Sequence, residues 1–140
     1  MALLNFKRVL HAMANATKDL CERAFYIDRP ASVDVPLNSY LVYDIESNFT
    51  NKEIDAQGGY DYFSCRVSFS LFVRDRKRAS NPSLMDLDVL DQKVSELLKR
   101  FPIVDKERKV RFYRPRIILH GTDGSGFHYA FIETLMDTNI

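Results

Sequence analysis

The chain has 140 residues, of which 46% are hydrophobic and 28% charged, and its formal net charge is +1 at pH 7. This length suits one domain with a single core, and this composition argues against both a disordered chain and a membrane protein. Because the charges nearly cancel, the overall field attracts neither nucleic acid nor an anionic membrane, so any polyanion binding must come from a local cluster.

The first element expected along the chain is an amphipathic helix over residues 2–20. Its apolar side chains recur three, four or seven positions apart, the spacing of one helix face, while Lys7 and Lys18 fall elsewhere. No apolar run reaches the roughly 20 residues that span a bilayer, so we expect an intracellular protein without a signal peptide. Pro30 and Pro36 then predict a connecting loop, because proline lacks an N–H and opposes helix.

Two strands are expected next, joined by a long exposed loop. Residues 37–47 are rich in β-branched and aromatic side chains, and residues 60–75 alternate between apolar and mostly polar positions. The intervening residues 46–59 have few large apolar groups and end in Gly58 and Gly59. One-sided alternation is typical of antiparallel pairing, so the two strands are predicted to form an extended hairpin.

A second amphipathic helix follows between Ser83 and Phe101. Ser83 and Asp86 stand in capping-box spacing, basic residues occupy the last turn, and Pro102 stops the helix.

Residues 110–120 and 127–137 flank a glycine-rich turn and predict a second hairpin. Pro115 cannot donate to a ladder, so its strand must lie at an edge or contain a bulge there. The predicted fold is a single α+β domain over residues 1–140, in the order αββαββ. Its sheet is mainly antiparallel, with two helices packed on one face and the other face left for water or a neighbouring subunit.

The sequence offers few groups arranged for catalysis. None of His11, His120 and His128 adjoins a nucleophile motif, and Cys21 and Cys65 lack metal or redox spacing, so two free buried thiols are expected. We expect no enzymatic activity, no cofactor and no metal ion.

One turn leaves a metal site open as an alternative. His120, Asp123 and His128 flank it, and imidazole with carboxylate suits zinc. The glycines of the turn also explain these polar residues by turn geometry alone.

The chain contains two groups of basic residues that would make a local phosphate-binding patch if the fold brought them together. They are Arg74, Arg76, Lys77 and Arg78 in one group, and Arg111, Arg114 and Arg116 in the other. A solvated face explains both groups equally well.

Read in order, the chain resembles the tail-terminator, or tail-completion, proteins of tailed phages. The likeness rests on the opening helix with Ala-Leu-Leu, on Phe-Tyr-Ile-Asp-Arg-Pro at residues 25–30, and on Pro-Leu-Asn-Ser-Tyr-Leu-Val-Tyr-Asp-Ile at residues 36–45. In that family these precede a long alternating strand, an amphipathic helix and a closing pair of strands. The resemblance covers nearly the whole chain, and residues 46–59 and 105–109 are candidate departures from it.

The resemblance implies a structural virion protein of the tail and neck region, assembled in the host cytoplasm. Six copies would form a ring that caps the tail tube, stops its polymerisation and provides the surface on which the head or its connector docks. The implied partners are further copies of the chain, the tail tube protein and the head–tail connector protein, with weak contact to DNA in the lumen. Neither a cofactor nor a membrane is implied.

On this interpretation the outward side chains of the long strand are candidate subunit contacts, because aromatic and arginine residues are enriched in interface cores. They are Tyr62, Arg66, Phe72 and Arg74, and Phe72 stands out as a large aromatic on the polar side. Candidate contacts with the tube or connector lie in the long loop, at Asn48, Phe49, Asn51, Lys52 and Glu53. A solvated sheet face and an idle surface loop are the alternatives.

Two other functions remain open from the sequence: a head–tail connector, or neck, protein, and a generic protein- or nucleic-acid-binding module. A nucleic-acid module would lose affinity steeply as salt rises, whereas a ring subunit would form closed toroids.

Overall fold

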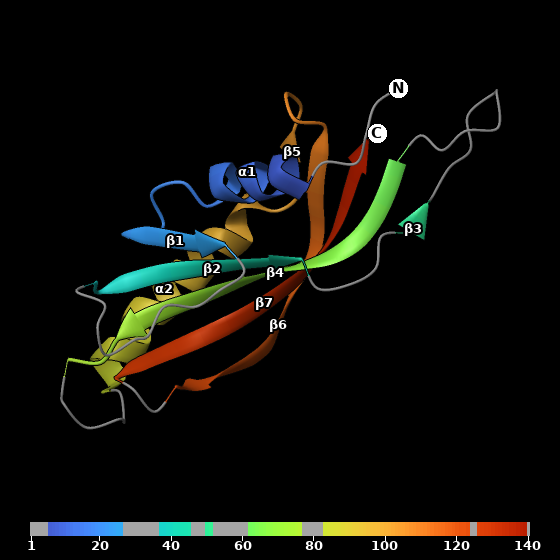
Figure 1. The fold of residues 1–140 in the computed structure, drawn as a ribbon. Coiled ribbons are helices and arrows are strands. Elements are labelled where there is room, and N and C mark those ends of the chain that lie inside the picture. Colours follow the sequence, from blue (N-terminus) through green and yellow to red (C-terminus); the bar gives the residue numbers. More distant parts are fainter. Residues whose placement is uncertain are drawn as a thin grey trace, which may run out of the picture.

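The computed structural model describes residues 6–26, 37–45, 50–51, 62–76, 83–123 and 126–139 (Figure 1). Within these residues the chain forms helices and a sheet, so the predicted α+β class is confirmed. The elements, in chain order, are α1 (Phe6–Ala16), β1 (Arg23–Tyr26), β2 (Ser39–Ile45), β3 (Thr50–Asn51), β4 (Tyr62–Arg74), α2 (Leu84–Arg100), β5 (Ile103–Asp105), β6 (Val110–Thr122) and β7 (Phe127–Asn139). No helix in this part of the chain is long and apolar enough to cross a bilayer.

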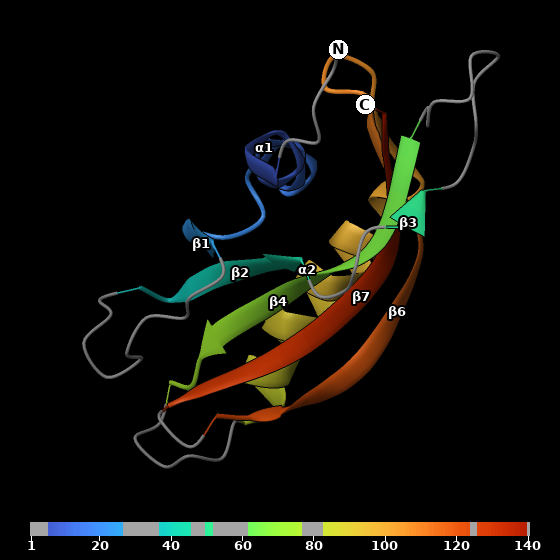
Figure 2. The same cartoon turned by 45° about the vertical axis from the view of Figure 1, so that its right-hand side comes forward.

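The strands form one sheet in the order β1-β2-β4-β7-β6-β5, with β3 paired to β4 outside that path. β1 runs parallel to β2, and the other pairs are antiparallel. β4 and β7, each of 13 residues, pair along the centre of the sheet, which curls strongly along their length (Figure 2). The predicted pairings of β2 with β4 and of β6 with β7 are both confirmed.

The predicted order αββαββ lacks the three short strands β1, β3 and β5. β3 lies inside the segment predicted to be an exposed loop, where Thr50 pairs with Ser64 and Asn51 with Phe63. Strands of two to four residues are held by backbone hydrogen bonds and are too short for a detectable side-chain period. The connecting loop predicted around Pro30 and Pro36 lies outside the described residues.

One hydrophobic cluster joins both helices to the sheet. Its buried members include Val9, Met13 and Ala16 from α1, Leu90, Val94 and Leu97 from α2, and Leu41, Phe69, Leu71, Phe112, Ile132 and Met136 from the strands. Burial of one such side chain stabilises the fold by roughly 1.5–3 kcal/mol. Since Phe69 and Leu71 of β4 belong to this cluster, the apolar positions of the alternating strand face the helices.

The boundaries of α2 follow from its sequence. The Ser83 hydroxyl accepts a hydrogen bond from the Asp86 N–H at 3.2 Å, and the Asp86 carboxylate accepts one from the Ser83 N–H at 3.1 Å, which confirms the predicted capping box. α1 is shorter than predicted and ends at Ala16. There the Thr17 hydroxyl donates to the Met13 carbonyl at 2.9 Å, a local bond that competes with helix continuation.

β6 contains the irregularity predicted from Pro115. Its register with β7 shifts between Tyr113 and Arg116, and Arg114 adopts a positive φ of 52°. β5 pairs with β6 only as far as Phe112. Beyond that residue, β6 forms an edge of the sheet in the described part of the chain.

Candidate functional site

The sheet face opposite the helices carries an aromatic cluster at the end where β2 begins and β4 ends. Its buried members are Tyr40, Val42, Phe72 and Phe127, with Phe25, Leu37 and Tyr129 packed against them. The Phe72 ring stacks between Tyr40 and Tyr129, with ring centroids 4.6 Å and 5.3 Å away. This cluster covers a face that the sequence predicted to be mostly polar.

The place of Phe72 among polar neighbours in the sequence had suggested that its side chain is exposed. In the structure this side chain is buried. Only 4% of its surface is accessible, because the flanking aromatic rings cover it within the subunit. The prediction of exposure fails since cross-strand neighbours, which the sequence does not name, decide burial on this face. A subunit contact at Phe72 would need an exposed side chain, so the burial of Phe72 removes the reason for predicting that contact.

The other predicted contacts on β4 are spread along the strand. Tyr62 begins β4, where it pairs with Asn139, and Arg74 ends it, up to about 40 Å away along an extended chain. The Arg74 guanidinium lies 4.5 Å from the centre of the Phe127 ring, and its Nε donates to the Leu37 carbonyl at 2.9 Å. These candidates do not converge on one patch.

Of the predicted tube or connector contacts, only Asn51 lies in the described residues, where its backbone pairs with Phe63. Asn48, Phe49, Lys52 and Glu53 lie outside them.

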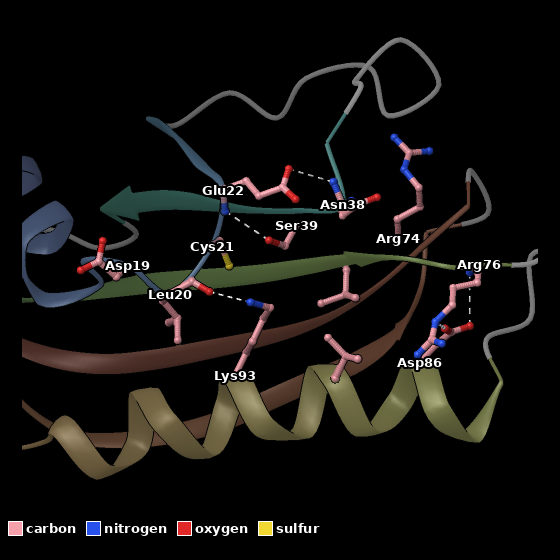
Figure 3. Close-up of a pocket in the computed structure, with 12 residues that line it drawn as sticks. Asp19, Leu20, Cys21, Glu22, Asn38, Ser39, Arg74, Arg76, Asp86 and Lys93 are labelled. Atoms are coloured by element: carbon pink, nitrogen blue, oxygen red, sulfur yellow. Dashed lines mark hydrogen bonds and ion pairs between the residues drawn. The ribbon is translucent and has the colours of Figure 1, made fainter.

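A cavity of about 780 Å³, here called the α2 pocket, opens between α2, the start of β2 and the end of β4 (Figure 3). Its charged lining consists of Asp19, Glu22, Arg74, Arg76, Asp86 and Lys93. The Lys93 ammonium donates to the Leu20 carbonyl at 2.7 Å, and the Glu22 carboxylate accepts from the Asn38 N–H at 3.1 Å. These bonds join α2 and β2 to the segment that links α1 to β1.

The carboxylate of Asp86 is the most buried charge of this pocket. It accepts from the backbone N–H groups of Ser83 and Arg76, and the Arg76 guanidinium lies 2.8 Å from it. Burial raises the pKa of Asp86, but these hydrogen bonds, the Ser83 hydroxyl and the Arg76 charge together lower it below its usual range. Asp86 therefore remains ionised at neutral pH and fixes the start of α2.

The Cys21 thiol also lines the α2 pocket, and it is chemically quiet. Burial raises the pKa of Cys21 to about 11, although the Lys93 charge and a hydrogen bond with Ser39 oppose the shift. Burial likewise raises the pKa of Cys65 to about 12. Both cysteines are free, as predicted, but Cys21 is only partly buried. Neither is a thiolate nucleophile at neutral pH.

The three residues of the alternative metal site do not come together. His128 is buried, where its Nδ1 bonds to the Asp75 carboxylate and its Nε2 lies 2.8 Å from the Asp86 carbonyl oxygen. Asp123 accepts from the Phe127 N–H, and His120 is exposed on β6. Among the described residues no group of three or more histidine, cysteine or acidic side chains could hold a metal ion.

The two basic groups also lie apart. Arg74 is ten residues along β4 from Ser64, whose cross-strand neighbour Asp137 pairs with Arg111. This separation is about 33 Å, and Arg116, whose cross-strand neighbour Glu133 lies opposite Ser68, is about 20 Å from Arg74, so the two groups do not form one patch. Lys77 and Arg78 lie outside the described residues.

A smaller cavity of about 190 Å³, here called the arginine pocket, lies where β6 bulges on β7. It is lined by Arg66, Arg114, Arg116, Glu133, Thr134 and Leu135. Glu133 lies 2.8 Å from Arg116 and 3.6 Å from Arg66. Arg66, predicted as a subunit contact, is thus part of a charged cluster whose other members come from strands far along the chain.

Two groups of exposed apolar residues also lie on the described surface. The edge patch consists of Ile117, Ile118 and Leu119 on the edge strand β6, with 48%, 46% and 54% of their surfaces accessible. The helix patch consists of Leu84 and Met85 at the start of α2, which are 82% and 63% accessible. Sequence reasoning missed both, although the Ile-Ile-Leu run after Pro115 was a readable signal of an apolar edge.

The chain matches no known protein-family model, and no curated protein is significantly similar to it in sequence.

Proposed function

We propose that this chain is a structural protein of a phage tail, a subunit of the tail-terminator type. Several copies, six by resemblance, form a closed ring on the end of the tail tube and stop the tube from growing. One rim of the ring meets the tube protein and the other receives the head–tail connector. The subunit is made in the host cytoplasm and becomes part of the virion.

The observation that carries this proposal is the pair of apolar patches on different elements of one subunit. A ring needs a heterologous contact, in which one patch of each copy meets a different patch of the next. The edge patch and the helix patch differ in backbone type and in residues, and both expose large side chains. Because the two patches differ, the edge patch of one copy is suited to contact the helix patch of the next copy rather than another edge patch.

The edge strand adds a second reason for assembly. Beyond Phe112, β6 lacks a strand partner on its outer side in the described part of the chain. Soluble proteins usually protect such an edge with charges, proline or a covering element, and here three large apolar residues interrupt that protection. Covering the edge patch in a ring removes apolar surface from water and ends the risk of open-ended pairing.

The phage-tail identity itself comes from the resemblance along the chain. A connector ring would use the same kind of subunit contact, so the two roles differ in what the rims bind. Mixing purified rings with tail tubes or with connector rings separates them.

Negative-stain electron microscopy of the purified protein at high concentration tests ring formation. The proposal predicts closed rings with a central opening, and light scattering after gel filtration gives the number of copies. The Leu119→Lys variant should remain monomeric, whereas Val104→Lys, which changes an equally exposed residue on β5, should still form rings. Monomers of the unchanged chain at all concentrations, with tail tubes present, would remove the proposal.

A further inference from the structure

Three methionines lie in the described part of the chain, and they differ in accessibility to water. Met13 on α1 and Met136 on β7 have none of their surface accessible, whereas 63% of Met85 is accessible. Met13 and Met136 belong to the hydrophobic cluster that joins the helices to the sheet, and Met85 belongs to neither hydrophobic cluster. A small reagent dissolved in water therefore reaches Met85 without any opening of the fold.

The thioether of an accessible methionine reacts with peroxides, because its sulfur is polarisable and nucleophilic. The sulfur of Met85 would donate a lone pair to one oxygen of hydrogen peroxide, so that an S–O bond forms as the O–O bond breaks. The second oxygen takes up the proton of the first and leaves as water. The sulfur is oxidised by two electrons to a sulfoxide, and the peroxide is reduced by the same two electrons.

The two thiols of the chain compete poorly for the same oxidant. Peroxides react with a thiolate rather than a thiol. Burial raises the pKa of Cys21 to about 11 and that of Cys65 to about 12, so neither sulfur is ionised at neutral pH. Among the described sulfur-containing residues, Met85 is therefore the most open to oxidation.

Oxidation of Met85 would change the chemistry of the helix patch. Leu84 and Met85 form this patch, and a sulfoxide oxygen turns the second of its side chains into a polar hydrogen-bond acceptor. The side chains of the edge patch are hydrocarbons and offer no donor, so contact between the patches would strip water from the new oxygen without replacing its hydrogen bonds. We propose that Met85 is a site of reversible oxidation, where a peroxide converts the thioether to a sulfoxide and weakens the contact between the helix patch and the edge patch. The effect on assembly rests on the proposed ring, whereas the oxidation site does not.

The fold itself should survive this oxidation. Met85 lies in the first turn of α2, but the hydrogen bonds that begin the helix are made by Ser83 and Asp86. The core of the subunit does not include the Met85 side chain. Oxidation of Met85 thus alters a surface used for assembly and leaves the subunit folded.

Peptide mass spectrometry after timed exposure to hydrogen peroxide at neutral pH tests the site. The Leu119→Lys variant is used, because it should stay monomeric and so leave Met85 uncovered at any concentration. Met85 should gain oxygen at least about tenfold faster than Met13 and Met136, and the difference should vanish in urea, where all three are exposed. Equal rates in the folded chain would overturn the proposal.

Gel filtration with light scattering, before and after complete oxidation of Met85, tests the effect on assembly. The protein concentration at which rings form should rise about ten- to hundredfold, the effect of burying one unpaired polar group. Methionine sulfoxide reductases, supplied with a dithiol that carries the oxygen away as water, should restore the rings. Met85→Leu is the matched control, because this exchange conserves apolar volume. It should form rings that peroxide leaves unchanged.

Rings that survive complete oxidation of Met85, or an equal loss of rings in peroxide-treated Met85→Leu, would overturn the effect on assembly. If the unchanged chain formed no rings before treatment, the ring proposal would fail and the effect on assembly with it. The oxidation rates of the three methionines would still decide whether Met85 is the oxidation site, so the two failures are distinguishable.

Discussion

The Nε2 atom of His128 lies 2.8 Å from the backbone carbonyl oxygen of Asp86, and this contact ties β7 to the first turn of α2. A carbonyl oxygen only accepts, so Nε2 must carry a proton. The other ring nitrogen bonds to the carboxylate of Asp75, which is also buried. One buried imidazole thus links three segments of the chain.

Replacing His128 should strongly destabilise the fold. His128→Ala leaves the Asp75 carboxylate buried without its partner, and such a change costs about 3–5 kcal/mol. Urea unfolding measures the loss, and His120→Ala, at an exposed position on β6, should change the free energy of unfolding by less than about 0.5 kcal/mol. Similar stabilities of the two variants would contradict a structural role for the buried pair.

Asp86 should make the free energy of unfolding depend on pH in the acid range. Its pKa is lowered in the folded chain, so its contribution is present above the unfolded value of about 4 and is lost as pH falls through the folded value. Asp86→Asn should cost about 1–3 kcal/mol at pH 7, and less as the pH falls below about 4. Urea unfolding from pH 7 to pH 3 checks this, with the exposed Asp88→Asn as the matched control. If Asp86→Asn lowered the free energy of unfolding equally at every pH, the result would contradict an ionised Asp86 at the start of α2.

The two thiols and Tyr43 should make the fold sensitive to alkali. Burial raises the pKa of Cys21 to about 11 and those of Tyr43 and Cys65 to about 12. A raised pKa stabilises the fold below the unfolded value and loses that contribution as pH rises toward the folded one, so stability should fall from about pH 9 upward. At pH 8 a thiol reagent should modify both cysteines rapidly only after unfolding. Rapid reaction in the native state would contradict these shifts.

Replacing Phe72 should lower the free energy of unfolding of the monomer, and not only affect assembly. Phe72→Ala removes the centre of the aromatic stack and should cost about 3–5 kcal/mol, whereas Val104→Ala at an exposed position should cost little. Thermal and urea unfolding of the monomer measure both variants. If the Phe72→Ala monomer were as stable as the unchanged chain, the result would contradict the buried position of Phe72 in the aromatic stack.

Much of the fold could be predicted from local patterns. The boundaries of α2 followed from Ser83, Asp86 and Pro102, and the long alternating strand identified which side chains face the helices. Both long hairpins followed from that alternation and from the glycine-rich turn. These features depend on residues close in sequence, whose periods report one element at a time.

The candidate sites could not be predicted in the same way. The arginine pocket assembles Arg66 from β4 with Arg116 from β6 through Glu133 on β7, and only the register of three strands brings them together. Phe72 was misjudged for the same reason, because Tyr40 and Tyr129 reach it across the sheet. Cross-strand contacts depend on register, and one sequence does not specify it.

Mixing two blocked variants tests the ring proposal most directly. Leu119→Lys disables the edge patch and keeps the helix patch, whereas Leu84→Lys does the reverse. A heterologous contact predicts that each variant alone is monomeric and that an equimolar mixture gives a one-to-one heterodimer that grows no further, seen by gel filtration with light scattering. Rings formed by either variant alone, or a mixture that stays monomeric, would contradict the contact between these two patches.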